Sequence, residues 1–138
     1  MGAERMAAQP LVLIVEDNPD NMYILDHLLT HSGYHVQQAT RGDEALMLID
    51  QQRPDLILMD MQMPGMDGYT MVQQLREQPA LSDLPVIAVT ASSMLGDREA
   101  ILEAGCTDYI AKPINPRVLL QLITQHLEGG HRGENSDR

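Results

Sequence analysis

The sequence predicts a doubly wound α/β domain, in which helices cover both faces of a five-stranded parallel sheet. Three observations lead to this prediction. Short β-prone runs alternate five times with stretches whose apolar residues recur at helical spacing. Three of these runs are apolar almost throughout, which is typical of parallel strands covered on both faces. The chain has 138 residues, enough for one domain with a substantial core.

The expected strands are five short runs of β-prone residues. In chain order they are LVLIV (11–15), HVQQA (35–39), LILMD (56–60), VIAVT (86–90) and DYIA (108–111). The first, third and fourth runs are the apolar ones, so we expect helices on both sides of these strands.

The segments between the runs are expected to be helices. Their apolar residues recur at helical spacing in five sets, Met22/Leu25/Leu29, Ala45/Leu48/Ile49, Met71/Val72/Leu75, Ile101/Ala104 and Leu119/Ile123/Leu127. Residue pairs that cap or open a first helical turn mark the starts, namely Asn18-Pro19, Gly42-Asp43, Asp67-Gly68, Ser92-Ser93 and Asn115-Pro116. Asp67 is therefore interpreted as a helix N-cap.

The domain is expected to span residues 10–128, because no linker or internal boundary interrupts the alternation. Residues 1–9 have no apolar stretch of the kind found in a signal peptide, so we interpret them as a flexible leader. Residues 129–138, GGHRGENSDR, carry no apolar side chain and are expected to be a disordered tail.

Charge and composition exclude several classes of partner. The formal charge is −11, with twenty acidic against nine basic residues, which repels both a nucleic-acid backbone and an anionic membrane. The longest apolar runs are far shorter than the roughly twenty residues of a membrane span. Cys106 is the single cysteine and is interpreted as a small buried hydrophobic residue. A cytoplasmic location follows, without nucleic-acid or membrane binding.

Polar residues follow the ends of four predicted strands. Glu16-Asp17, Asp60, Thr90 and Lys112 stand at these ends, and the crevice of a doubly wound sheet lies outside the carboxyl ends of its strands. We therefore expect three carboxylates, a hydroxyl and an ammonium group at one edge. Capping of a strand explains any one of these residues but not the whole set.

Three clustered carboxylates repel one another unless a cation neutralises them. Mg²⁺ prefers a few carboxylates together with waters and phosphate oxygens, whereas the sequence has neither a calcium-loop spacing nor a Cys/His set for zinc. Lys112 is the only lysine of the chain, and its flexible stem can reach a phosphoryl oxygen. Asp60 is then free to act as a nucleophile toward phosphorus.

The segment from Leu11 to Leu127 resembles the receiver domain of two-component response regulators, which has a flavodoxin-like fold. The resemblance lies in four motifs in order, VEDNPDN, LILMDMQMPGMDG, VIAVTA and DYIAKP. The opening EDNPDNMYIL is similar to single-domain regulators and to receivers of hybrid histidine kinases.

The resemblance implies that Asp60 takes a phosphoryl group from a histidine kinase or a histidine phosphotransfer protein. It implies that Glu16, Asp17 and Asp60 bind Mg²⁺, or Mn²⁺ in its place, together with the backbone carbonyl of Gln62. No enzymatic activity is expected beyond the domain's own phosphorylation and dephosphorylation. Gln62 and Ser92 match positions that set the dephosphorylation rate in the family.

The resemblance also implies a switch. Thr90 and Lys112 match residues that contact the phosphoryl group, and Tyr109 matches an aromatic residue that changes rotamer on activation. Pro113 follows the lysine, where the family often has a cis peptide bond. The expected output face consists of the helix after VIAVT, the strand DYIA and the helix within NPRVLLQLITQHL, and it serves an unidentified protein partner.

Two other functions fit the same fold class. A flavodoxin-like cofactor-binding domain needs a phosphate-cradling loop after the first strand, where EDNPDN would repel a phosphate. An aspartate-nucleophile phosphatase needs a second acid two residues after the nucleophile, where Gln62 stands.

Among the remaining candidate residues, His27 and His31 lack a third metal ligand and are expected to be exposed. The methionines of residues 59–71 are expected to fill gaps and to line a docking surface.

Overall fold

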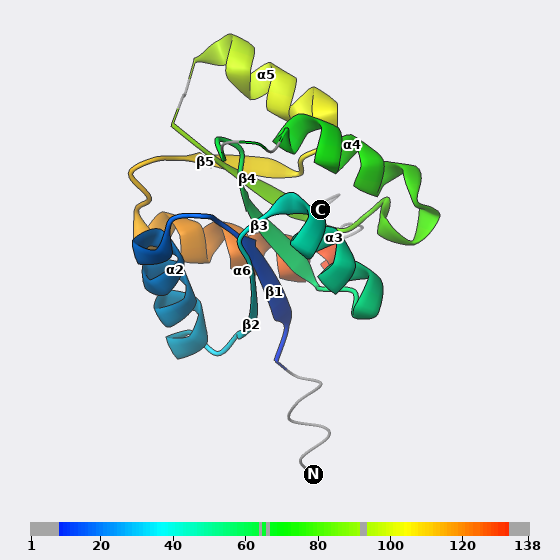
Figure 1. Cartoon of the computed structure of the whole chain (residues 1–138). Helices are drawn as coiled ribbons and strands as arrows, with labels where there is room; N and C mark the ends of the chain where they lie inside the picture. Colours follow the sequence, from blue (N-terminus) through cyan, green and yellow to red (C-terminus); the bar gives the residue numbers. More distant parts are fainter. Residues whose placement is uncertain (1–8, 64, 66, 92–93, 133–138) are drawn as a thin grey trace.

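The computed structural model describes residues 9–63, 65, 67–91 and 94–132, and it contains one parallel sheet (Figure 1). Its strands are β1 (Leu11–Val15), β2 (His35–Ala39), β3 (Leu56–Asp60), β4 (Val86–Thr90) and β5 (Asp108–Ala111). They lie in the order β2-β1-β3-β4-β5. The sequence-based prediction of a five-stranded doubly wound sheet is confirmed, and the five runs match the strands residue for residue.

Within the described part of the chain, five α-helices and one short 3₁₀ helix connect and flank the strands. They are α2 (Pro19–His31), α3 (Gly42–Gln51), α4 (Gly68–Glu77), η1 (Pro79–Leu81), α5 (Leu95–Ala104) and α6 (Pro116–Arg132). Helices α3, α4 and α5 pack on one face of the sheet, and α2 and α6 pack on the other. The 3₁₀ turn η1 was not expected from the sequence.

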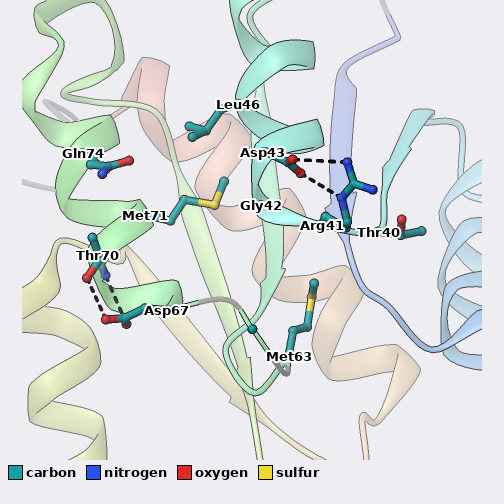
Figure 2. Close-up of a pocket in the computed structure, with 11 residues that line it drawn as sticks. Thr40, Arg41, Gly42, Asp43, Leu46, Met63, Asp67, Thr70, Met71 and Gln74 are labelled. Atoms are coloured by element: carbon teal, nitrogen blue, oxygen red, sulfur yellow. Dashed lines mark hydrogen bonds and ion pairs between the residues drawn. The ribbon is translucent and has the colours of Figure 1, made fainter.

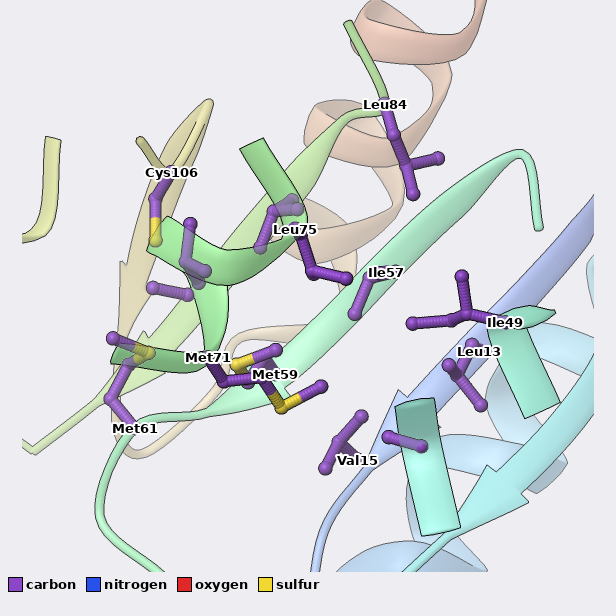
Figure 3. Packing of buried hydrophobic residues seen from close by; sticks show 14 of the residues in the cluster. Leu13, Val15, Ile49, Ile57, Met59, Met61, Met71, Leu75, Leu84 and Cys106 are labelled. Carbon is purple, nitrogen blue, oxygen red and sulfur yellow. The ribbon is translucent and has the colours of Figure 1, made fainter. Parts of the chain in front are cut away.

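Two hydrophobic clusters separate along these faces, as expected for central strands covered on both sides. The first cluster lies under α3, α4 and α5 and includes Leu13, Ile57, Met59 and Leu75 (Figure 3). The second lies under α2 and α6. Every residue of β1, β3 and β4 is buried, whereas the edge strand β2 has one buried residue, Ala39.

The strand register aligns the carboxyl ends at one edge of the sheet. Val15 of β1 pairs with Met59 of β3, and Asp60 pairs with Val89 of β4. The residues that follow β1, β3, β4 and β5 therefore meet at this edge, which is where the sequence places its polar residues.

Three of the expected helix starts are confirmed by capping contacts. The side chains of Asn18, Asp67 and Asn115 accept hydrogen bonds from backbone N–H groups in the first turns of α2, α4 and α6. Helices α3 and α5 have no side-chain cap; α3 begins at Gly42, as expected, and α5 begins at Leu95 after its N-cap residue Met94. The expected start at Ser92-Ser93 lies outside the described residues.

The two ends of the chain are described only in part. Helix α6 runs to Arg132, four residues into the segment that was expected to be disordered, because helix propagation adds one hydrogen bond for each residue. Residues 133–138 and almost all of the expected leader lie outside the described residues. Within the described ranges, no helix is both long enough and apolar enough to cross a membrane.

The connection from α5 to β5 depends on Gly105 and on Arg76 of α4. Gly105 ends α5 with a φ of 115°, a left-handed conformation that glycine adopts without a steric penalty. The Arg76 guanidinium donates to the carbonyl oxygens of Gly105 and Leu81, each at 2.8 Å. A Cβ atom on Gly105 would come within 2.8 Å of Arg76 Cγ. Arg76 thereby joins α4 to the turn before β5.

Candidate functional site

Buried polar residues are concentrated at the carboxyl edge of the sheet. Among the residues that the structure describes, the buried polar or charged ones are Glu16, Asp60 and Thr90, each 3–4% exposed. They follow or end β1, β3 and β4. Buried carboxylates destabilise a fold unless they are paired or bind a cation, so this grouping indicates a functional site.

The Asp60 carboxylate accepts hydrogen bonds from a side-chain ammonium group and from a backbone N–H group. The Lys112 Nζ lies 3.3 Å from its Oδ1 and 3.2 Å from its Oδ2. The backbone N–H of Gln62 donates to Oδ1 at 2.9 Å, within the loop that follows β3. Lys112 reaches this position because it directly follows β5, and its backbone N–H donates to the Thr90 carbonyl at 2.8 Å. The ammonium group therefore offsets part of the Asp60 charge.

Glu16, Asp17 and Asp60 form one acidic cluster. Each offers a carboxylate oxygen that lies within 4.8 Å of those of the other two. Burial raises the pKa of Glu16 above its ordinary value, and the nearby Asp60 carboxylate raises it further. The N–H of Asn18 donates to Glu16 Oε2 at 3.0 Å and opposes this effect. These hard oxygen donors suit a divalent cation such as Mg²⁺, which would relieve their mutual repulsion.

The Gln62 side chain makes a contact that the sequence did not predict. Its Oε1 accepts a hydrogen bond of 2.6 Å from the backbone N–H of Ala91, the residue after Thr90. This contact joins the loop after β3 to the loop after β4. The use of the Gln62 carbonyl as a metal ligand stays a prediction.

Tyr109 lies on β5 next to β4, where it pairs in register with Ala88. Its ring is half-buried and packs against the first cluster. Its hydroxyl accepts a hydrogen bond of 3.0 Å from Arg98 Nη1 of α5, a partner that was not expected from the sequence. The peptide bond between Lys112 and Pro113 is cis, as the family resemblance implies.

Several other ionisable residues have structural roles outside the acidic cluster. Burial raises the pKa of the Cys106 thiol to about 11, so this thiol stays protonated and behaves as a hydrophobic group. The rings of His27 and His31 lie against each other on the exposed side of α2, with ring centroids 4.0 Å apart and ring planes tilted by 36°. Asp55 accepts from the Leu11 N–H at 2.7 Å, and Asp108 pairs with His126 at 2.8 Å. None of these groups belongs to the acidic cluster.

Two pockets lie near the carboxyl edge of the sheet. One, of about 340 Å³, borders the site through Glu16 and Lys112 and is otherwise mostly apolar, with Ile24 and Leu25 of α2 among its lining residues. The other, of about 610 Å³, lies between α3 and α4 (Figure 2). Met63 and Met71 line it although both are buried, so that the methionines line a docking surface stays a prediction. None of the three clustered acids lines this larger pocket.

Comparisons with known proteins identify relatives of the whole domain. The family model for the response regulator receiver domain matches residues 12–124. The polar-differentiation response regulator DivK of Brucella anthropi is 44% identical over 116 residues, which cover 84% of this chain and 94% of DivK.

Solved structures agree with this relationship. The chemotaxis response regulator CheY4 of Vibrio cholerae has a TM-score of 0.82 and 29% identity, covering 86% of this chain and 99% of CheY4. The receiver domain of sensor histidine kinase PA1611 from Pseudomonas aeruginosa has a TM-score of 0.80 and 37% identity, covering 88% and 99%. That structure contains a magnesium ion coordinated in its active site cleft. Sequence, fold and family model thus agree, and the chain belongs to the response regulator receiver domain family.

Proposed function

We propose that Asp60 is the phosphoacceptor of this receiver domain. A carboxylate oxygen of Asp60 attacks the phosphorus of a phosphohistidine on a histidine kinase or a phosphotransfer protein. The new P–O bond forms while the P–N bond breaks, and the electron pair returns to the imidazole nitrogen, which takes up a proton. Asp60 suits this role because it is the only residue of the acidic cluster that also contacts Lys112 Nζ.

Glu16, Asp17 and Asp60 are proposed to hold Mg²⁺, with the backbone carbonyl of Gln62 as a further ligand and Mn²⁺ as an alternative ion. The clustered carboxylate oxygens and the raised pKa of Glu16 support this proposal. When bound, the ion supplies positive charge to the oxygens of the transferring phosphoryl group.

Lys112 and Thr90 are proposed to receive the phosphoryl group once it is attached. Lys112 Nζ already lies within 3.3 Å of both Asp60 carboxylate oxygens, so it can follow the charge as it moves onto the phosphoryl oxygens. The buried hydroxyl of Thr90 stands at the end of the neighbouring strand β4. A turn of this hydroxyl toward the phosphoryl group vacates space for the Tyr109 ring.

Two surfaces are proposed to meet protein partners. The phosphoryl donor docks over the apolar pocket of about 340 Å³, because this pocket adjoins Glu16 and Lys112 at the reacting group. The output partner binds the face of α5, β5 and α6, where Met94, Leu95 and Val118 are exposed apolar residues.

The domain acts as a switch without turnover of a separate substrate. We propose a cytoplasmic location, with which a chain that has a single cysteine and so no internal disulfide is consistent.

The observation that carries this proposal is the contact of Asp60 with Lys112 inside the acidic cluster. The test is incubation of the full chain with acetyl phosphate and Mg²⁺, followed by intact mass measurement. One added phosphoryl group is expected, and a chelator should abolish it.

Asp60→Asn should lose the added mass. Asp67→Asn is the matched control, because Asp67 is an exposed N-cap in the same loop and asparagine caps a helix equally well. Equal labelling of Asp60→Asn and the wild type would contradict the assignment of the acceptor.

A further inference from the structure

Arg98 and Tyr109 link helix α5 to strand β5. Arg98 Nη1 donates a hydrogen bond of 3.0 Å to Tyr109 Oη, and the guanidinium carbon lies 5.8 Å from the centroid of the ring. A cation at this distance is attracted to an aromatic face. Two interactions from one side chain therefore hold the Tyr109 ring in its present position.

The position of Tyr109 makes this contact relevant to switching. Tyr109 and Ala111 pair in register with Ala88 and Thr90 of β4, so the ring lies on the strand beside the Thr90 end. The ring is half-buried against the first cluster. A movement into space vacated by the Thr90 hydroxyl would carry Tyr109 Oη away from α5 and break its hydrogen bond to Arg98.

The Arg98 side chain is incompletely satisfied in this arrangement. Its Nε is buried and, within the described residues, has no hydrogen-bond partner. A buried donor without a partner lowers the stability of the arrangement that contains it. The hydrogen bond from Arg98 therefore favours the present position of Tyr109. The unpaired Nε reduces the free-energy difference between the two positions of the ring, so that phosphorylation can reverse the preference.

We propose that Arg98 is a positioning residue, which stabilises the resting position of Tyr109 and couples the orientation of α5 to the state of the phosphoacceptor site. This inference rests on the proposed function in one respect, the assignment of Tyr109 as the switch residue. Because of thermodynamic linkage, a contact that exists only in the resting arrangement lowers the affinity of the phosphoacceptor site for any ligand that favours the other arrangement.

The experiment uses the full chain with Mg²⁺ and beryllofluoride, a mimic of the phosphoryl group. Arg98→Ala should bind beryllofluoride about fivefold more tightly than the wild type, since a typical net hydrogen bond is removed from the resting arrangement alone. In a Tyr109→Phe background, the same Arg98→Ala change should alter the affinity by about twofold or less, because the hydroxyl acceptor is already absent. Arg53→Ala is the charge control, since Arg53 pairs with Asp83 and is absent from the acidic cluster and its contacts.

A second readout is the position of the Tyr109 ring itself. In metal-free protein with labelled tyrosine, the Tyr109 ring resonances of Arg98→Ala should lie closer than those of the wild type to the positions that the wild type shows when beryllofluoride is bound. Tyr109 ring resonances that are the same in Arg98→Ala and in the wild type would overturn the positioning role.

The affinity measurement separates this inference from the proposed function. If the wild type binds beryllofluoride through Asp60 and Arg98→Ala binds it equally or more weakly, the positioning role is wrong and the phosphoacceptor assignment stands. If Asp60→Asn binds beryllofluoride as the wild type does, the phosphoacceptor assignment is wrong. A purely structural role for Arg98 would lower the urea midpoint of unfolding and leave the affinity unchanged, which also overturns the inference.

Discussion

Gln62 Oε1 accepts a hydrogen bond of 2.6 Å from the backbone N–H of Ala91, so the loop after β3 and the loop after β4 are joined. The donor belongs to the residue that follows Thr90, and the acceptor lies two residues after Asp60. A phosphoryl group on Asp60 needs hydrogen-bond donors at this edge of the sheet. If Asp60 carries the phosphoryl group, as proposed, we expect the side-chain oxygen of Gln62 to compete with a phosphoryl oxygen for the Ala91 N–H.

Gln62→Ala should accordingly increase the affinity for beryllofluoride by about fivefold, because a competing acceptor is removed from the Ala91 N–H. The amide resonance of Ala91 should report the exchange of acceptors during the titration. Gln73→Ala, at an exposed position of α4, is the control. An Ala91 amide that does not respond to beryllofluoride would rule out this competition.

In the metal-free protein, Glu16 should make a contribution to stability that is lost as the pH rises. Burial raises the pKa of Glu16 above 4.5, so the native state binds its proton more tightly than the unfolded state. Its contribution is fully present below pH 4.5 and is lost as the pH rises through the raised value. Urea unfolding in the presence of a chelator, at several pH values, measures this loss in the wild type and in Glu16→Gln.

The free energy of unfolding of Glu16→Gln minus that of the wild type removes the contributions that the other acids make in both proteins. This difference should increase as the pH rises. Saturating Mg²⁺ should reverse the increase, because it stabilises the charged cluster of the wild type. A difference that does not change with pH would mean that the Glu16 pKa is not raised.

Thr90→Ala should separate phosphorylation from switching. Asp60 keeps its contacts with Lys112 and Gln62 in this variant, so labelling by acetyl phosphate should persist. The response of the Tyr109 ring resonances to beryllofluoride should be mostly lost, because under the proposed switch the Thr90 hydroxyl links the ring position to the phosphoryl group, and without it the space beside the ring is the same in both states. A full ring response in Thr90→Ala would show that the signal does not pass through Thr90.

Gly105→Ala should destabilise the fold by about 1–3 kcal/mol, because an L side chain is strained at a left-handed position and its Cβ would also meet Arg76. Gly96→Ala is a matched control in the same helix, since Gly96 has open space around its Cα and no positive φ. Alanine there should stabilise α5 by up to about 1 kcal/mol. Urea midpoints compare the two variants, and equal effects would contradict the backbone argument.

The sequence was most informative about features that depend on the path of the backbone. Alternating periodicities predicted the strands and the sheet, and the rule for carboxyl ends brought Glu16, Asp17, Asp60 and Lys112 together. Both inferences depend on the periodicity of apolar residues and on positions relative to strand ends, and neither depends on the rotamer of a side chain. The start of α5 was less accessible, because Met94 gives no capping signal.

The contacts missed by the sequence analysis are made by long polar side chains. Arg76 reaches Gly105, Gln62 reaches Ala91 and Arg98 reaches Tyr109, across 29, 29 and 11 residues respectively. Each side chain has several rotamers, and its partner depends on how two elements pack. Neither residue type nor spacing distinguishes these three from exposed glutamine or arginine residues elsewhere in the chain.

The two faces of the sheet differ in how easily they can be deformed. Among the described residues, the first cluster contains four methionines, Met59, Met61, Met63 and Met71, whereas the second contains one, Met22. Unbranched thioether side chains refill a changed space by rotation, whereas branched side chains resist it. We therefore expect the packing under α3, α4 and α5 to adjust more readily than the packing under α2 and α6 when the surroundings of Asp60 change.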